Sequence, residues 1–108
     1  MWSLRAWLAS LSGPRGQFIG TVGERGDFIL RLVEKRGLPE TDRWEARTLY
    51  KFKDAQGNSA TWFASGAIEL HDAVVGQSYE VRARVRDHSV YNGVRETYLE
   101  RAKLSPLG

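Results

Sequence analysis

Residues 81–104 read VRARVRDHSVYNGVRETYLERAKL, two alternating runs separated by a short loop. In the first run, valine and alanine alternate with Arg82, Arg84 and Arg86. Alternation of apolar and polar residues is the two-residue period of a half-buried strand. Asn92-Gly93, between the runs, is a turn dipeptide. The stretch therefore predicts two strands, the first of which carries three arginines on its outer face.

Three further segments show the pattern of strands. They are DFILRLVEK (27–35), WEARTLYKFK (44–53) and SATWFAS (59–65). The second and third flank DAQGN, a tight-turn sequence. The connection GAIELHDAVVGQ (66–77) has room for one or two helical turns. With strands over 78–88 and 95–104, the chain has five predicted strands and no long helix, which indicates an all-β domain.

A small closed barrel protects the edges of five short strands most economically. Three strands, a longer connection and two more strands follow the order of a five-stranded OB-like barrel. Leu4, Trp7, Leu8 and Leu11 have helical spacing, which predicts a short N-terminal helix. We expect the helix and a connector over 1–17, the barrel over 18–104 and a tail over 105–108. The helix either docks on the barrel or presents Trp2 and Trp7 to a protein partner.

The composition limits the classes of function. The chain of 108 residues suffices for one domain, and its net charge of +3 permits an anionic partner. Twelve of the 16 basic residues are arginine, which suits phosphate binding but also fits a GC-rich genome. The absence of cysteine excludes disulfides and thiolate zinc sites, and two histidines are too few for a histidine-rich metal site. We therefore expect no metal or cofactor.

No apolar run reaches the length of a membrane span, so no membrane association is expected. The N-terminus is too short and too interrupted by Arg5 for a signal peptide. Together with the absence of cysteine, these features favour a cytoplasmic location. The sequence leaves the oligomeric state open.

Three stretches together resemble a known family. They are FIGTVGERGDF (18–28), TLYKFKDAQGNSATWFAS (48–65) and GQSYEVRARVRDHSVYNGVRETYLERAKL (76–104). They are similar to the OB-like domain that recurs in phage-encoded and bacterial DNA-metabolism proteins. The resemblance covers roughly residues 18–104 and implies a module that binds single-stranded nucleic acid, not a catalyst. It supplies no binding residue, so the candidate site comes from the residues themselves.

An OB barrel binds single strands on the outer face of strands two and three and on the flanking loops. Such binding needs cations for phosphates and aromatic rings for bases. Phe63 shares a face with Thr61 and Ser65 and is expected to point outward, whereas Trp62 points inward with alanines. The candidate residues are Arg36, Arg43, Trp44, Lys51, Lys53, Phe63, Arg86, His88, Tyr91 and Arg95.

Some of these residues have a structural alternative. Phe63 could pack under the N-terminal helix or a loop, and His88 could cap the end of its strand by an internal hydrogen bond. For Arg82 and Arg84 we favour a solvated face paired with Glu34 and other carboxylates, whereas Arg86 lies nearer the binding-side loop. An enzyme is not expected, because the carboxylates are scattered and Asp87, His88 and Ser89 are merely adjacent in sequence.

The sequence predicts an OB-like barrel that binds single-stranded DNA or RNA with little sequence specificity; DNA is the first expectation, but the sequence leaves the choice between DNA and RNA open. The alternative is a protein-interaction module. Such a module would use the barrel face and the Trp2 and Trp7 helix to recruit a partner in a replication, repair or phage complex.

Overall fold

The computed structural model describes residues 13–107, and the predicted N-terminal helix with Trp2 and Trp7 lies outside them. Five strands account for most of the described chain, which confirms the all-β prediction. They are β1 (Arg25–Leu38), β2 (Arg47–Lys53), β3 (Ser59–Ser65), β4 (Ser78–Tyr91) and β5 (Val94–Pro106). One 3-10 turn, η1 (Ile68–Leu70), lies in the connection between β3 and β4.

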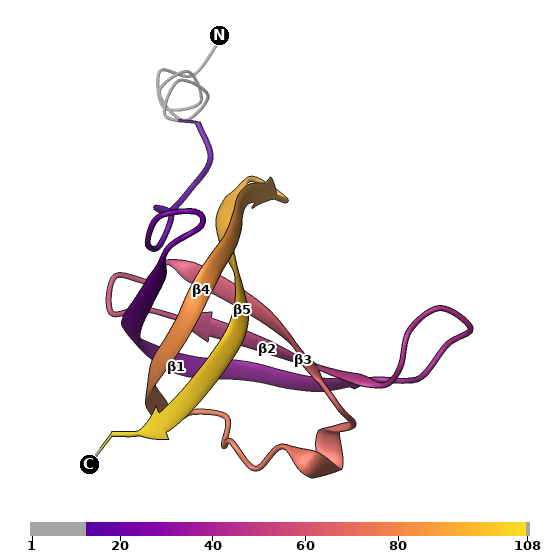
Figure 1. Cartoon of the computed structure of the whole chain (residues 1–108). Coiled ribbons are helices and arrows are strands. Elements are labelled where there is room, and N and C mark those ends of the chain that lie inside the picture. Colours follow the sequence, from indigo (N-terminus) through magenta and orange to yellow (C-terminus); the bar gives the residue numbers. More distant parts are fainter. Residues whose placement is uncertain (1–12, 108) are drawn as a thin grey trace, which may run out of the picture.

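The strands close into a barrel in the order β1-β2-β3-β5-β4 (Figure 1). Neighbouring strands are antiparallel except β3 and β5, which run parallel from Ser59 opposite Glu96 to Trp62 opposite Leu99. The pairing of β4 with β1 completes the circle. Closure pairs the strand edges that would otherwise be open to other chains.

Alternating side chains of every strand fill the barrel. Leu30 and Leu32 of β1, Phe52 of β2 and Val81 and Val85 of β4 are fully buried. These inward positions repeat every second residue because successive side chains of a strand point to opposite faces. The same period places a stripe of outward side chains between them, and the candidate site belongs to that outer stripe.

Trp62 packs against this core, which confirms the predicted inward orientation. Its ring lies 4.8 Å from the ring of Tyr50. The Tyr50 hydroxyl donates to Nδ1 of His71 over 2.6 Å, since His71 uses its Nε2–H to reach the carbonyl oxygen of Ser65 at 2.9 Å. Burial raises the pKa of Tyr50, with a further contribution from Asp72. This cluster fastens the β3–β4 connection to the barrel.

Two strands are longer than their sequence pattern predicted. β1 continues to Leu38 after a bulge at Val33, so Arg36 lies in a strand and not in the following loop. β4 continues to Tyr91, and the turn to β5 shrinks to Asn92 and Gly93, both with positive φ. The predicted loops were wrong here because cross-strand pairing extends both strands beyond the segments that alternate.

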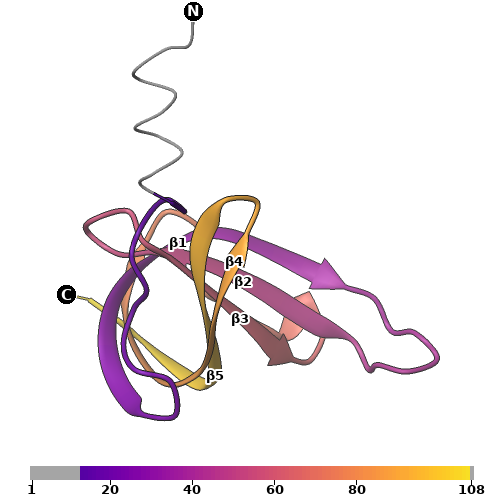
Figure 2. The same cartoon turned by 90° about the horizontal axis from the view of Figure 1, so that it is seen from above.

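The segment before β1 lies along the β4–β5 hairpin. Arg15 forms a parallel bridge with Val94: its amide donates to Gly93 over 2.8 Å and its carbonyl accepts from Arg95 over 2.9 Å. Further along, the amide of the buried Ile19 donates to the Thr97 hydroxyl over 2.8 Å. The loop between β1 and β2 instead projects from the barrel body (Figures 1 and 2).

Candidate nucleic-acid interface

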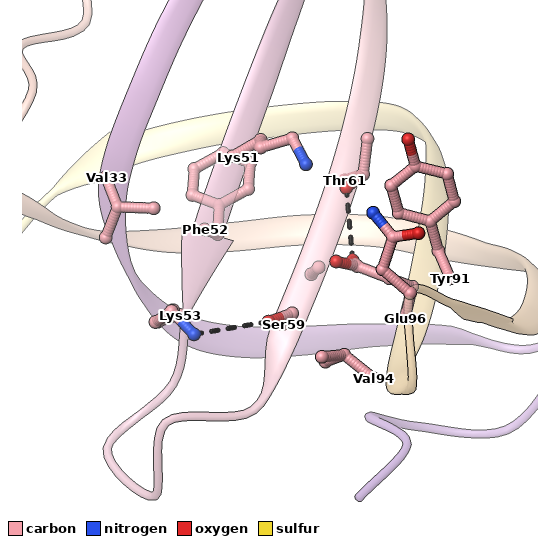
Figure 3. A pocket seen from close by; sticks show the side chains of 11 residues that line it. Val33, Lys51, Phe52, Lys53, Ser59, Thr61, Tyr91, Val94 and Glu96 are labelled. Carbon is pink, nitrogen blue, oxygen red and sulfur yellow. Dashed lines mark hydrogen bonds between the residues drawn. The ribbon is translucent and has the colours of Figure 1, made fainter. Parts of the chain in front are cut away.

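A groove crosses the outer face of β2 and β3. It consists of two adjoining hollows of about 270 and 260 Å³. Both are lined by Lys51, Thr61, Tyr91 and Glu96, so they form one continuous surface, here called the outer groove. Figure 3 shows the first hollow and the side chains around it. The sequence predicted a site on this face, and the fold provides a concave surface there.

The second hollow has an apolar floor. Leu49 of β2 is buried although it occupies an outer position, because it lies between Arg36 of β1 and Phe63 of β3. Leu38 and Tyr98 complete the apolar wall. Burial, and secondarily the neighbouring Glu96 carboxylate, raise the pKa of Tyr98, so its phenol stays neutral. Such a floor suits the flat face of a base better than a phosphate.

Lysine and arginine side chains reach the groove from two strands. Lys51 lines both hollows and, within residues 13–107, forms none of the ion pairs. Lys53 lines the first hollow, where its Nζ lies 3.3 Å from the Gly57 carbonyl and 3.4 Å from the Ser59 hydroxyl. Arg36 lines the second hollow, and its Nε lies 3.6 Å from Oε2 of Glu34. Lys51 is therefore the cation best placed for a phosphate.

Two aromatic side chains of the outer groove are exposed enough to stack on a ligand. Phe63 is 38% exposed in the second hollow, which confirms that it points outward. Tyr91, 59% exposed, lines both hollows from the end of β4. The rings come from strands far apart in sequence, and the barrel brings them to one surface.

Arg47 is a candidate residue that sequence reasoning missed. Its guanidinium lies 4.9 Å from the ring centre of Trp44 and 5.2 Å from that of Phe63. Its Nε is buried and has no hydrogen-bond partner among the described residues. The alternation of β2 already placed Arg47 on the outer face with Lys51, which was the available signal. The stack links the exposed Trp44 to the groove.

The loop that carries Arg43 and Trp44 is ordered by Thr41. The Thr41 hydroxyl accepts from both backbone amides, at 3.3 and 3.1 Å, and the Thr41 amide donates to the Trp44 carbonyl over 2.8 Å. Arg43 is exposed and lines neither hollow. Only Trp44 of this pair reaches towards the groove, through Arg47.

Arg86 lies at a different opening from the outer groove. It is the extra residue of a bulge in β4, and its guanidinium lies 5.8 Å from the Tyr98 ring centre. With Arg101 it lines a hollow of about 360 Å³ beyond the end of the β3–β5 pairing. Phe63 lines this hollow as well as the outer groove, so an extended ligand could pass from one to the other.

The structure does not bring His88 and Arg95 to the outer groove. The His88 ring stacks on Phe18 at 4.4 Å, and its Nε2 donates to the Ile19 carbonyl over 3.1 Å. Arg95 donates to the carbonyls of Pro14 and Gly16 and lies over the same Phe18 ring. Both side chains hold the segment before β1 on the hairpin, because their positions alternate with those of Tyr91 and Glu96 and so face the opposite side of it.

The arginine stripe of β4 is a solvated, ion-paired face, as predicted for its first two members. Arg82 binds Asp27 and Arg84 binds Glu100, each at 2.8 Å. The hydrogen bond from Arg82 holds the pKa of Asp27 below its usual value. The predicted pairing of the stripe with Glu34 was wrong, since Glu34 pairs with Arg36 of its own strand, β1.

A carboxylate in the outer groove was also missed. Glu96 of β5 lines both hollows, although it is only 9% exposed. The Thr61 hydroxyl donates to its Oε2 over 3.2 Å (Figure 3). Glu96 alternates with the inward Thr97 and Leu99 along β5, but the parallel pairing with β3 that brings it beside Thr61 has no local signal.

No three histidine, cysteine or acidic side chains of residues 13–107 gather closely enough to hold a metal ion. Over the same residues, no helix is long and apolar enough to cross a membrane. No protein-family model, curated protein or solved structure matches the chain. The groove itself is therefore the basis for inferring function.

Proposed function

We propose that the chain is an OB-like barrel that binds single-stranded nucleic acid in the outer groove, as a cytoplasmic binding module without catalytic activity. The closed five-stranded barrel supports the fold assignment, and its groove lies where OB barrels bind oligonucleotides. DNA is the proposed ligand because the sequence resembles domains of DNA-metabolism proteins.

One observation carries this proposal: a lysine that forms no ion pair within residues 13–107 lines the same groove as two exposed rings. Lys51 can neutralise a phosphate, while Phe63 and Tyr91 can stack on neighbouring bases. Stacking on a protein ring requires unpaired bases, because in a duplex the neighbouring base pairs cover each base face. The apolar floor at Leu49 favours bases over phosphates in the second hollow. This combination supports a single strand as the ligand.

A labelled single strand of mixed sequence tests the proposal by fluorescence anisotropy at several salt concentrations. The logarithm of affinity should fall linearly with the logarithm of salt concentration, because each neutralised phosphate releases counterions. An unlabelled duplex of the same sequence should compete poorly. Absence of binding at low salt, or affinity independent of salt, would contradict the proposal.

A second candidate is the protein-interaction module. Three aliphatic side chains, Leu70, Val74 and Val75, are exposed in the connection between β3 and β4. Exposed apolar side chains are typical of surfaces that bind other proteins. This candidate predicts that the labelled single strand shows none of the salt-dependent binding that the nucleic-acid proposal requires.

A further inference from the structure

The buried carboxylate of Glu96 conflicts with a groove that only binds phosphates. It lies in the part of the groove shared by both hollows, with Lys51 and Tyr91 around it. A carboxylate there repels a phosphate, and burying one without compensation is costly. In residues 13–107, no ion pair involves Glu96. Its position is best explained by a ligand that donates hydrogen bonds.

The hydrogen bonds of Glu96 leave acceptor capacity facing the groove. Thr61 donates to Oε2, and no described side chain donates to Oε1. An ionised carboxylate has about four acceptor sites on its two oxygens. The Thr61 bond also fixes the orientation of the group. Glu96 therefore presents a positioned pair of acceptors in the part of the groove that Tyr91 also lines.

Among the four DNA bases, guanine matches a pair of acceptors best. Its Watson–Crick edge carries two neighbouring donors, N1–H and the N2 amino group. Cytosine and adenine place an acceptor nitrogen beside their amino group, and thymine places its single N3–H donor between two carbonyls. In a single strand this edge is free to be read.

We propose that Glu96 binds the Watson–Crick edge of one guanine in the strand, while the Tyr91 ring stacks on that base or its neighbour. This inference rests on the proposed function and adds one position of base preference to it. Lys51, which lines the same two hollows, balances the carboxylate and faces the adjoining phosphate. Thr61 acts as a positioning residue for the carboxylate.

The test compares three short labelled oligothymidylates: one unmodified, one with a central guanine and one with hypoxanthine instead. Hypoxanthine lacks only the N2 amino group. A good bidentate contact discriminates by at least about fivefold, so the guanine strand should bind about fivefold more tightly than the unmodified strand. The hypoxanthine strand should fall between them. Equal affinity for all three would overturn the inference while leaving the proposed function standing, and no binding would overturn both.

Glu96→Gln should bring the ratio of affinities for the guanine strand and the unmodified strand towards one. It should also raise affinity for the unmodified strand, since it removes a negative charge. Glu80→Gln is the matched control, because Glu80 is exposed on β4, lines neither hollow and makes the same charge change. Thr61→Val should weaken the preference without altering charge. A guanine preference that persists in Glu96→Gln would overturn the assignment. Free guanosine monophosphate should compete weakly; competition as strong as that of the guanine strand would overturn recognition within a strand.

Discussion

Replacing Phe63 by alanine separates a stacking platform from a structural ring. The side chain is 38% exposed, so more than half of it is buried against Leu49 and Arg47. Complete burial of a phenylalanine contributes about 1.5–3 kcal/mol, and the Arg47 contact contributes about 0.5–1 kcal/mol. We therefore expect Phe63→Ala to lower the free energy of unfolding by about 1.5–3 kcal/mol and to leave the barrel folded.

The effect of Phe63→Ala on binding should be of similar size. Loss of one stacked base costs about 1–3 kcal/mol, which is roughly a five- to 150-fold loss of affinity. The salt dependence should remain that of the parent, because no phosphate contact is removed. Fluorescence anisotropy at several salt concentrations and urea denaturation measure the two effects on the same preparation.

Phe63→Leu is the matched control. It keeps most of the apolar volume over Leu49 and should cost less than about 1.5 kcal/mol of stability. It removes the ring, so affinity should still fall close to that of Phe63→Ala. A leucine variant that binds like the parent would show that Phe63 acts by filling space, and the stacking platform would be refuted.

Three other predictions concern charge, core and pH. Lys51→Ala should weaken binding modestly and make the slope of log affinity against log salt shallower by about 0.7, the value for one phosphate contact of a single strand; an unchanged slope would remove Lys51 from the interface. Trp62→Ala should lower the free energy of unfolding by about 2–4 kcal/mol in urea denaturation, somewhat less than for a fully buried ring because Trp62 is only partly buried; a variant that melts like the parent but loses binding would reverse its assigned orientation. Because folding raises the pKa of Tyr50, its stabilising contribution is complete below the unfolded pKa near 10.0 and disappears as pH rises through the folded pKa. Denaturation at several alkaline pH values should show this loss in the parent and a smaller one in Tyr50→Phe.

The sequence alone determined that the chain has five strands and, for the central strands, which side chains face outward. Trp62 and Phe63 are adjacent, yet their opposite orientations follow from alternation with Ala60, Thr61 and Ala64. This information is local, because a strand reverses side-chain direction at every residue whatever its partner. The outward positions of Lys51 and Phe63 could therefore be assigned before any pairing was known.

Only the tertiary structure decided which outward residues share a surface. Arg95 and Glu96 are neighbours in β5, but one holds the segment before β1 and the other lines the groove. Their opposite directions follow from alternation, but what each side chain meets is set by the parallel pairing of β5 with β3 and by the chain packed on the hairpin, which are contacts between residues far apart in sequence. The alternation of side chains within one strand does not specify which segments lie beside it. The carboxylate at the centre of the groove, which defines its proposed base preference, becomes visible only when the barrel closes.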